Sequence, residues 1–227
     1  MLKRSVDIVL SAVALLVFSP VFVVVAIAIK CGSPGPVFFR QVRVGRFGKS
    51  FKIFKFRTMV ANADRIGGPS TKADDPRITP VGRWIRRLNL DELPQFINVF
   101  KGEMSIVGPR PEVPQYVALF TEDEREMFSV RPGITDWATL WIRDEGKILA
   151  GSEDPEKAYM EKIWPEKHRL ALEYVKRQSF LVDVQIMLQT LKVHLLDRIF
   201  SSADCALNSG WTLQDVPNPT GEVEKGR

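Results

Sequence analysis

Residues 8–29 read IVLSAVALLVFSPVFVVVAIAI and contain no charged side chain. A helix needs about 20 mainly apolar residues to cross the hydrocarbon core of a bilayer, so this stretch is long enough to span one. Ser19 and Pro20 lie near its middle. Proline removes a backbone donor and its ring clashes with the carbonyl one turn earlier, here that of Leu16, so we expect a kink. The Ser19 hydroxyl can satisfy part of the freed backbone, which lipid cannot do.

Basic residues flank the apolar stretch at both ends. They are Lys3 and Arg4 before it, and Lys30, Arg40, Arg43 and Arg46 after it. Because basic residues near a membrane segment prefer the cytoplasmic side, the pattern favours a helix that enters the inner leaflet, bends and returns. A kinked single-pass helix is the alternative. A cleavable signal peptide is disfavoured, because the stretch exceeds the usual core of about 7–15 apolar residues and no small-x-small cleavage site follows it.

The composition limits the classes of ligand that we expect the protein to bind. The chain has 227 residues, a formal net charge of +5 and an isoelectric point near 9.3. A basic balance beside a membrane segment favours anionic lipid headgroups or phosphorylated substrates. Nucleic acid is disfavoured because no zinc-finger or RNP-type motif is present. Cys31 and Cys205 are too few and too far apart for a disulfide framework or a CxxC metal site, and His168 and His194 form no metal cluster with them.

The remaining pattern predicts an α/β (α+β) chain: a membrane helix, then a mostly helical domain with a small β-hairpin and interfacial amphipathic helices. Three units follow, with a membrane segment at 1–31, a catalytic domain at 32–200 and a flexible tail at 201–227. The helix expected at 181–196 is strongly apolar, and either packs in the core or lies on a membrane surface. The other expected elements are strands at 37–39 and 51–56 joined by a hairpin loop at 45–49, a polar loop at 67–80, and helices at 82–88, 93–99, 122–128 and 155–178.

Two adjacent carboxylates, Asp91 and Glu92, are the first candidates for chemistry. Such a pair usually marks only a solvated helix start, because acids stabilise helix N-termini. Here the surrounding residues are cationic: Arg83, Arg86, Arg87, Lys101 and Arg110. A carboxylate among cations stays ionised and can approach a phosphate that those cations partly neutralise. Attack on phosphorus would give an acyl phosphate, and the second carboxylate could hold Mg²⁺ together with substrate phosphates.

Three further places carry charge in unusual surroundings. The prolines around Arg110 in Gly108-Pro109-Arg110-Pro111 stiffen the loop that presents a guanidinium suited to phosphate, although an ordinary rigid loop would look the same. Lys55 and Arg57 lie two residues apart, on one face of the expected strand, and could face a membrane surface or a diphosphate. Asp183 stands alone among apolar residues. It is either exposed on an amphipathic helix or a buried partner of one of these cations.

Six motifs in order make the chain resemble a known family. The resemblance runs from Lys3 to about Leu196 and is to bacterial sugar transferases of the monotopic phosphoglycosyl transferase family, in their small form. Each motif alone is modest, but six in the right order are very specific. They are Phe18-Ser19-Pro20, Lys55-Phe56-Arg57-Thr58-Met59, Leu90-Asp91-Glu92-Leu93-Pro94-Gln95, Asn98-Val99-Phe100-Lys101-Gly102, Met104-Ser105-Ile106-Val107-Gly108-Pro109-Arg110-Pro111 and Arg131-Pro132-Gly133-Ile134-Thr135.

The resemblance implies a re-entrant helix and an α/β catalytic domain on the cytoplasmic face of the bacterial inner membrane. It also implies transfer of a sugar-1-phosphate from a nucleoside-diphosphate sugar, usually a UDP-sugar, to polyprenol phosphate. By resemblance Asp91 is the nucleophile, Glu92 is the Mg²⁺ ligand, Lys55 and Asp183 support the site, and Arg110 contacts phosphate. We add Arg57 and Arg87 as candidate phosphate-binding cations. The sequence leaves a homodimer open.

The chain departs from the family pattern after Thr135. Family members often continue Gly-Trp-Ala-Gln and then an Asn-Gly-Arg string, whereas this chain has Asp136 and Thr139 in place of two of these residues and lacks the string. The segment 136–146 carries both signs of charge, including Arg143, Asp144 and Glu145. We therefore predict that it lies near the donor sugar and tunes the choice of donor, although a solvated surface loop would show the same pattern.

Two alternative functions would not require a catalysed transfer reaction. A catalytically silent, membrane-anchored binding subunit of an envelope-polysaccharide assembly would keep the fold but would not need the acid pair. A nucleotide-binding regulator is disfavoured because the chain has neither a GxxxxGK[ST] nor a GxGxxG loop. Release of UMP from a UDP-sugar separates the enzyme from the binding subunit.

Overall fold

The N-terminal segment forms two helices that meet at a sharp bend. In this computed structural model, which describes residues 2–67, 71–72, 74–142 and 145–200, α1 spans Leu2–Val17 and α2 spans Ser19–Gly32. The two axes differ by 58°. The Ser19 hydroxyl donates to the Leu16 carbonyl at 2.7 Å, so the hydroxyl satisfies the acceptor beside the proline break. The predicted kink is confirmed. Within the described residues no single helix could cross a bilayer, but the bent pair together is long and apolar enough.

Polar side chains attach α1 to the rest of the protein. Arg4 donates to the carbonyls of Val99 and Phe100 at 2.6 and 3.0 Å. The buried Asp7 carboxylate accepts from the Ile106 amide at 3.0 Å and from the Ser105 hydroxyl at 3.1 Å. A charged residue buried in an apolar helix is costly unless its hydrogen bonds are satisfied, and these bonds satisfy it. The other side of α1 is apolar and exposed, through Val9, Val13 and Leu16.

Two small sheets lie at the centre of the protein. β1 (Phe38–Val44) and β2 (Ser50–Phe56) form an antiparallel hairpin that turns through the 3-10 helix η1 (Arg46–Gly48), as predicted, although β1 is longer than expected. β3 (Ser105–Val107) and β4 (Gly133–Thr135) form a separate parallel pair. Parallel strands bring their carboxyl ends to the same edge, so the loops that follow β3 and β4 lie side by side.

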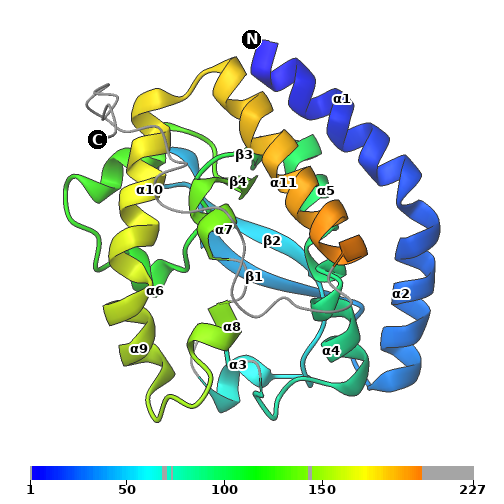
Figure 1. Cartoon of the computed structure of the whole chain (residues 1–227). Helices are drawn as coiled ribbons and strands as arrows, with labels where there is room; N and C mark the ends of the chain where they lie inside the picture. Colours follow the sequence, from blue (N-terminus) through cyan, green and yellow to red (C-terminus); the bar gives the residue numbers. More distant parts are fainter. Residues whose placement is uncertain (1, 68–70, 73, 143–144, 201–227) are drawn as a thin grey trace.

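Helices surround these sheets (Figure 1). The helix expected at 155–178 is divided at Ile163, because Pro165 has no amide donor and is tolerated only in the first turn of a new helix. The residues expected to be helical at 122–128 form a 3-10 helix instead. The remaining elements are α3 (Ala63–Ile66), α4 (Pro80–Arg87), η2 (Leu90–Glu92), α5 (Gln95–Lys101), α6 (Pro114–Val117), η3 (Glu124–Ser129), α7 (Trp137–Trp141), α8 (Glu145–Ile148), α9 (Pro155–Lys162), α10 (Trp164–Arg177) and α11 (Phe180–Phe200).

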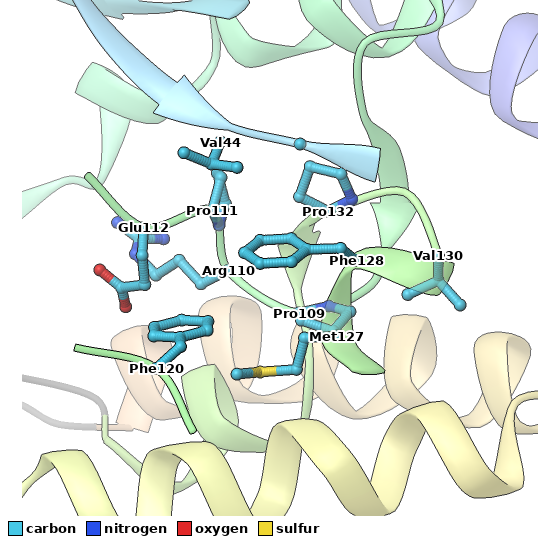
Figure 2. A pocket seen from close by; sticks show the side chains of 11 residues that line it. Val44, Pro109, Arg110, Pro111, Glu112, Phe120, Met127, Phe128, Val130 and Pro132 are labelled. Atoms are coloured by element: carbon cyan, nitrogen blue, oxygen red, sulfur yellow. The ribbon is translucent and has the colours of Figure 1, made fainter. Parts of the chain in front are cut away.

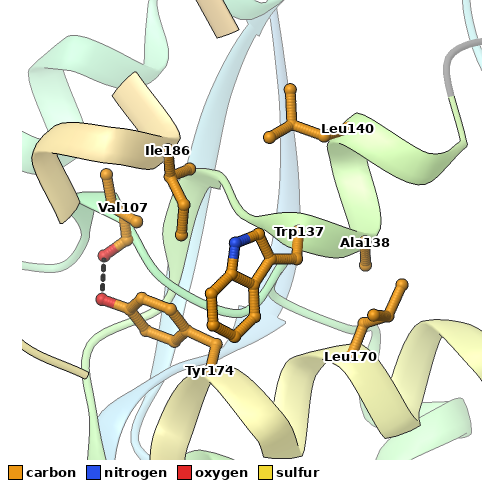
Figure 3. Close-up of a cluster of buried hydrophobic side chains, with 7 residues drawn as sticks. All are labelled: Val107, Trp137, Ala138, Leu140, Leu170, Tyr174 and Ile186. Atoms are coloured by element: carbon orange, nitrogen blue, oxygen red, sulfur yellow. Dashed lines mark hydrogen bonds between the residues drawn. The ribbon is translucent and has the colours of Figure 1, made fainter. Parts of the chain in front are cut away.

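The main core joins β3, α7, α10 and α11 (Figure 3). Trp137, Tyr174 and Ile186 are its large, fully buried side chains, and the Tyr174 hydroxyl donates to the Val107 carbonyl at 3.2 Å. Burying an aromatic side chain contributes roughly 2–3 kcal/mol. α11 therefore packs in the core on one side. The first alternative for this helix, packing in the core, is therefore confirmed. Its other side is exposed and apolar, with Leu181 78% and Leu188 63% accessible, and contact with a membrane surface stays a prediction.

Close contact between two glycines positions the loop after β3. A Cβ atom on Gly133 would lie 2.1 Å from the Gly108 nitrogen, and one on Gly108 would lie 2.4 Å from the Arg131 carbonyl oxygen. No side chain fits at such distances, so glycine is required at both positions. The Gly108 amide donates to the Thr135 carbonyl at 3.0 Å, and this bond aligns the Gly108–Glu112 segment with the end of β4.

Candidate active site

Two of the predicted cations, Lys55 and Arg110, meet at the predicted carboxylate of Glu92. Lys55 on β2 donates to Glu92 Oε1 at 2.8 Å. Arg110, in the loop after β3, pairs with both oxygens of Glu92: Nη1 lies 3.2 Å from Oε2, and Nη2 contacts Oε1. A forked guanidinium–carboxylate contact fixes both groups in orientation as well as in position. A strand, a 3-10 turn and a loop that are distant in sequence thus converge on Glu92.

The neighbouring carboxylate, Asp91, has a different environment. Among the described residues, none donates a hydrogen bond to the Asp91 carboxylate or forms an ion pair with it. Burial raises the pKa of Asp91, against the attraction of the Lys55 ammonium. Burial alone would also raise the pKa of Glu92, but the charges of Arg110 and Lys55 outweigh it and hold this pKa well below the usual range. Adjacent acids with opposite environments are suited to different tasks.

The backbone explains why the two acids diverge. Asn89 adopts the left-handed conformation with φ 52°, which asparagine tolerates better than most residues, and so ends α4 abruptly. Leu90, Asp91 and Glu92 then form one turn of 3-10 helix. Successive side chains in a 3-10 helix point about 120° apart, so Glu92 can face Lys55 and Arg110 while Asp91 faces elsewhere.

Two of the predicted phosphate-binding residues have other partners. Arg57 is 6% exposed and donates to the carbonyls of Ser33, at 2.9 Å, and Pro34, which form the turn after α2. The expectation that Arg57 shares a strand face with Lys55 is wrong, because β2 ends at Phe56. Arg87 lies exposed in the last turn of α4.

Asp183 is buried, but its partner is neither Lys55 nor Arg57. Its carboxylate accepts from Lys3 Nζ and from the Tyr174 hydroxyl, both at 2.6 Å. Lys3 Nζ also donates to the Val107 carbonyl at 3.0 Å. Asp183 therefore links α11 to the beginning of α1, and its support of the site is indirect, through the strand that precedes the Gly108–Glu112 loop.

A buried ionic cluster lies behind Arg110, and sequence analysis did not find it. Glu112 Oε1 pairs with Lys167 Nζ at 2.6 Å, and Lys167 also donates to the Tyr159 hydroxyl at 2.7 Å. Burial would raise the pKa of Glu112, but the charges of Lys167 and Arg43 lower it. The one sign of this cluster in the sequence is the acid, Glu112, that directly follows Gly-Pro-Arg-Pro. Nothing near Glu112 in the sequence indicates that Lys167 is its partner.

A small cavity lies beside the same loop (Figure 2). Its walls are mainly apolar. Phe120 and Phe128 stack with ring centroids 5.6 Å apart and an angle of 10° between their planes, and Pro109 and Pro132 lie nearby. Arg110 contributes to the lining and also reaches Glu92, so its stem packs against apolar groups while its guanidinium is held by charge.

The two residues that depart from the family pattern after β4 form a pair. Asp136 caps the N-terminus of α7: its Oδ1 accepts from the Thr139 amide and from the Thr139 hydroxyl, both at 2.7 Å. Asp136 is only 1% exposed. Arg143 and Asp144, together with the tail at 201–227, lie outside the described residues.

The paired cap makes a prediction about stability. Asp136→Ala should lower the free energy of unfolding by about 1 kcal/mol, the usual contribution of an N-cap. Thr139→Ala should cost little more in the Asp136→Ala background, because the side-chain bond is already lost. Urea unfolding of the two single variants and the double variant measures this. Strictly additive losses would show that the two residues are not coupled.

Comparison with known proteins identifies the family of this chain. Residues 1–197 match the model of the family described as bacterial sugar transferase. The chain belongs to the bacterial sugar transferase family. It is 45% identical over 201 residues to the UDP-glucose:undecaprenyl-phosphate glucose-1-phosphate transferase of Escherichia coli. The matched region covers 84% of this chain and 39% of the relative.

Other members of the bacterial sugar transferase family are similar over the same region. An uncharacterized sugar transferase of Bacillus subtilis, EpsL, is 39% identical over 84% of this chain and 86% of its own length. The UDP-N-acetylgalactosamine-undecaprenyl-phosphate N-acetylgalactosaminephosphotransferase of Aeromonas hydrophila is 38% identical over 86% of this chain and 44% of its own length. The chain thus spans about two fifths of the length of the Escherichia coli and Aeromonas relatives.

Proposed function

We propose that this bacterial sugar transferase moves a sugar-1-phosphate from a nucleoside-diphosphate sugar, most simply a UDP-sugar, to polyprenol phosphate. The names of the relatives support this choice of substrates, since they pair UDP-sugars with undecaprenyl phosphate. The observation that carries the proposal is the contrast between the adjacent acids. Glu92 is held by two cations, whereas the Asp91 carboxylate has no partner within the described structure and is free to react.

The chemistry proceeds in two displacements at one phosphorus atom. A carboxylate oxygen of Asp91 attacks the phosphorus that carries the sugar, the bond to the nucleotide phosphate breaks, and UMP leaves with the electron pair. An oxygen of polyprenol phosphate then attacks the resulting acyl phosphate and releases the Asp91 carboxylate. Lys55 and Arg110 stabilise the negative charge on the phosphate oxygens in both steps. Such charge stabilisation is usually the largest contribution to catalysis of this kind.

Glu92 has two tasks in this scheme. It orients Lys55 and Arg110, and together with Asp91 it would hold Mg²⁺. Magnesium is commonly bound by one or two carboxylates with substrate phosphates completing the shell, so the unpaired Asp91 carboxylate beside Glu92 is a suitable donor set. When bound, the ion would neutralise phosphate charge. Within the described residues no third histidine, cysteine or acid joins the pair, which fits an ion shared with substrate.

The same proposal places the protein on the cytoplasmic face of the bacterial inner membrane, with α1 and α2 as a re-entrant pair. The bend of 58°, the polar attachment of α1 to the domain and the exposed apolar faces of both helices support it. One substrate is a lipid and the other is soluble in water, so the site must lie at the boundary between the two. We retain a membrane segment at 1–31 and a catalytic domain at 32–200 as parts of this proposal, and leave the oligomeric state, a homodimer included, open.

We also propose that the segment 136–146 contacts the donor sugar and determines which donor is used. The charge of Glu92 is the main reason why the pKa of Arg110 is raised, and the charge of Glu145 contributes in the same direction. This contribution supports, within the proposal, a place for α8 near the donor.

The test is to mix the purified protein with Mg²⁺, polyprenol phosphate and each of a panel of UDP-sugars, and to measure UMP. We expect UMP release with at least one donor, and the ranking of donors identifies the sugar. A silent binding subunit would bind a UDP-sugar without releasing UMP from any member of the panel.

A further inference from the structure

The Gly108–Glu112 loop is held from two sides. On the side of the hairpin, Arg43 Nη1 donates to the Pro111 carbonyl at 2.9 Å, and the Val44 amide donates to the Glu112 carbonyl at 3.0 Å. On the side of the helices, the Glu112 carboxylate pairs with Lys167 of α10 at 2.6 Å. The loop that carries Arg110 is therefore fastened to β1 and to α10 immediately after Arg110.

The Glu112 carboxylate is the only negative side chain that the described ion pairs give to Lys167 and Arg43. Arg43 Nη1 lies 4.0 Å from Glu112 Oε2, and the side chains of Glu112 and Lys167 are 8% and 10% exposed. Removing one partner of a buried pair leaves an uncompensated charge, which is strongly unfavourable. Without Glu112, Lys167 and Arg43 would move toward water or toward another acid, and the loop would follow Arg43.

A small cavity lies beside the loop. The cavity in Figure 2 is lined by Val44 of β1, Pro109 of the loop and Phe128 of η3. Packed interiors resist small displacements, whereas a loop next to a cavity can shift. A shift of the Gly108–Glu112 loop would carry the Arg110 guanidinium away from Glu92, because only Pro111 separates Arg110 from Glu112.

We propose that Glu112 is a positioning residue for Arg110: its ion pair with Lys167 holds the Gly108–Glu112 loop so that the guanidinium can bind a phosphate of the donor. This inference rests on the proposed function and adds a residue to its machinery. Glu112 itself touches neither Glu92 nor Asp91 within the described contacts, so its effect on the donor is indirect.

The experiment measures how the covalent sugar-phosphate adduct forms at increasing donor concentration in the absence of polyprenol phosphate. Glu112→Gln keeps the size of the side chain and removes its charge. We expect the limiting rate divided by the half-saturating donor concentration to fall about tenfold, because Arg110 binds the donor phosphate and also stabilises its charge during attack. Glu112→Asp, which keeps the charge, should recover part of the affinity.

The matched control is Glu124→Gln. Glu124 pairs with His168 Nδ1 at 2.5 Å, so this change also removes a charged partner from a buried residue of α10, but it does not touch the Gly108–Glu112 loop. Its donor curve should match the wild-type curve. Glu112→Gln combined with Lys167→Met removes the stranded charge as well, and should recover thermal stability without recovering donor affinity.

These variants separate the outcomes. If Glu112→Gln has the wild-type donor curve, Glu112 does not position Arg110. Where Glu112→Gln does not fold, the double variant is used for the same comparison. If Glu124→Gln weakens donor binding equally, the effect is general loss of stability and the inference is wrong. If the wild-type protein forms neither adduct nor UMP with any donor, the proposed function itself fails and the inference falls with it.

Discussion

Asp91→Asn should abolish both UMP release and the covalent adduct, lowering turnover by at least about 10³-fold, the scale of loss when a nucleophile is removed. The wild-type protein incubated with the donor alone should gain one sugar-phosphate mass on a peptide that contains Asp91. The amide of asparagine has nearly the same size but is a poor nucleophile. Intact-protein and peptide mass spectrometry, with UMP measured in parallel, reports the result.

Glu92→Gln is the matched control, because it alters the adjacent acid in the same turn. It should slow the reaction and weaken its dependence on Mg²⁺, since Lys55 and Arg110 lose their common partner, but the adduct on Asp91 should still form. An Asp91→Asn protein that turns over at the wild-type rate would remove Asp91 from the mechanism. An adduct found on Glu92 instead would exchange the two roles.

Adduct formation by the wild-type protein should also depend on pH in a particular direction. Attack requires the ionised carboxylate, and burial raises the pKa of Asp91 above its ordinary value of 3.8. The rate should therefore decline as pH falls, beginning at a higher pH than an ordinary aspartate would give. A single-turnover pH profile checks this, with Glu92 remaining ionised across the range because its pKa is lowered.

Replacing Ser19 with Ala and Pro20 with Leu should change the topology of the N-terminal segment. The missing donor and the ring clash disappear, so residues 8–29 can form one straight helix that crosses the bilayer. The N-terminus would then reach the periplasm. We expect a cysteine in place of Leu2, which is 61% exposed, to be protected in the wild-type background and labelled in the variant. The measurement uses an impermeant reagent on intact cells.

Two features of the chain shape this experiment. Cys31 and Cys205 must first be replaced by Ser so that only the introduced cysteine reacts. If the segment crosses the membrane, Lys3 must also leave Asp183, and Arg4 must leave the carbonyls of α5. The control is Ser19→Ala alone. This variant keeps the proline, so its cysteine at position 2 should stay protected. Labelling of the wild-type position from outside would mean that the segment simply spans the membrane.

Local physics explains what could be predicted from the sequence. Proline kinks or breaks a helix when it lies beyond the first turn, so Ser19-Pro20 located the bend. The alternation of apolar and basic residues in 51–56 located β2, and the acid pair among cations located Asp91 and Glu92. Each of these signals depends on neighbours within a few residues. The expected single helix at 155–178 was wrong, although Pro165 already contained the reason.

Long-range contacts explain the rest. Nothing near Asp183 indicates that its partner is Lys3, 180 positions away, and nothing near Lys167 indicates Glu112. The choice of Glu92, rather than Asp91, as the partner of Lys55 and Arg110 follows from the turn after Asn89 and from where β2 and the Gly108–Glu112 loop lie. A buried charge takes whichever opposite charge the packing brings within reach. The residue types in the site were therefore readable in the chain, but their partners depended on how distant segments pack together.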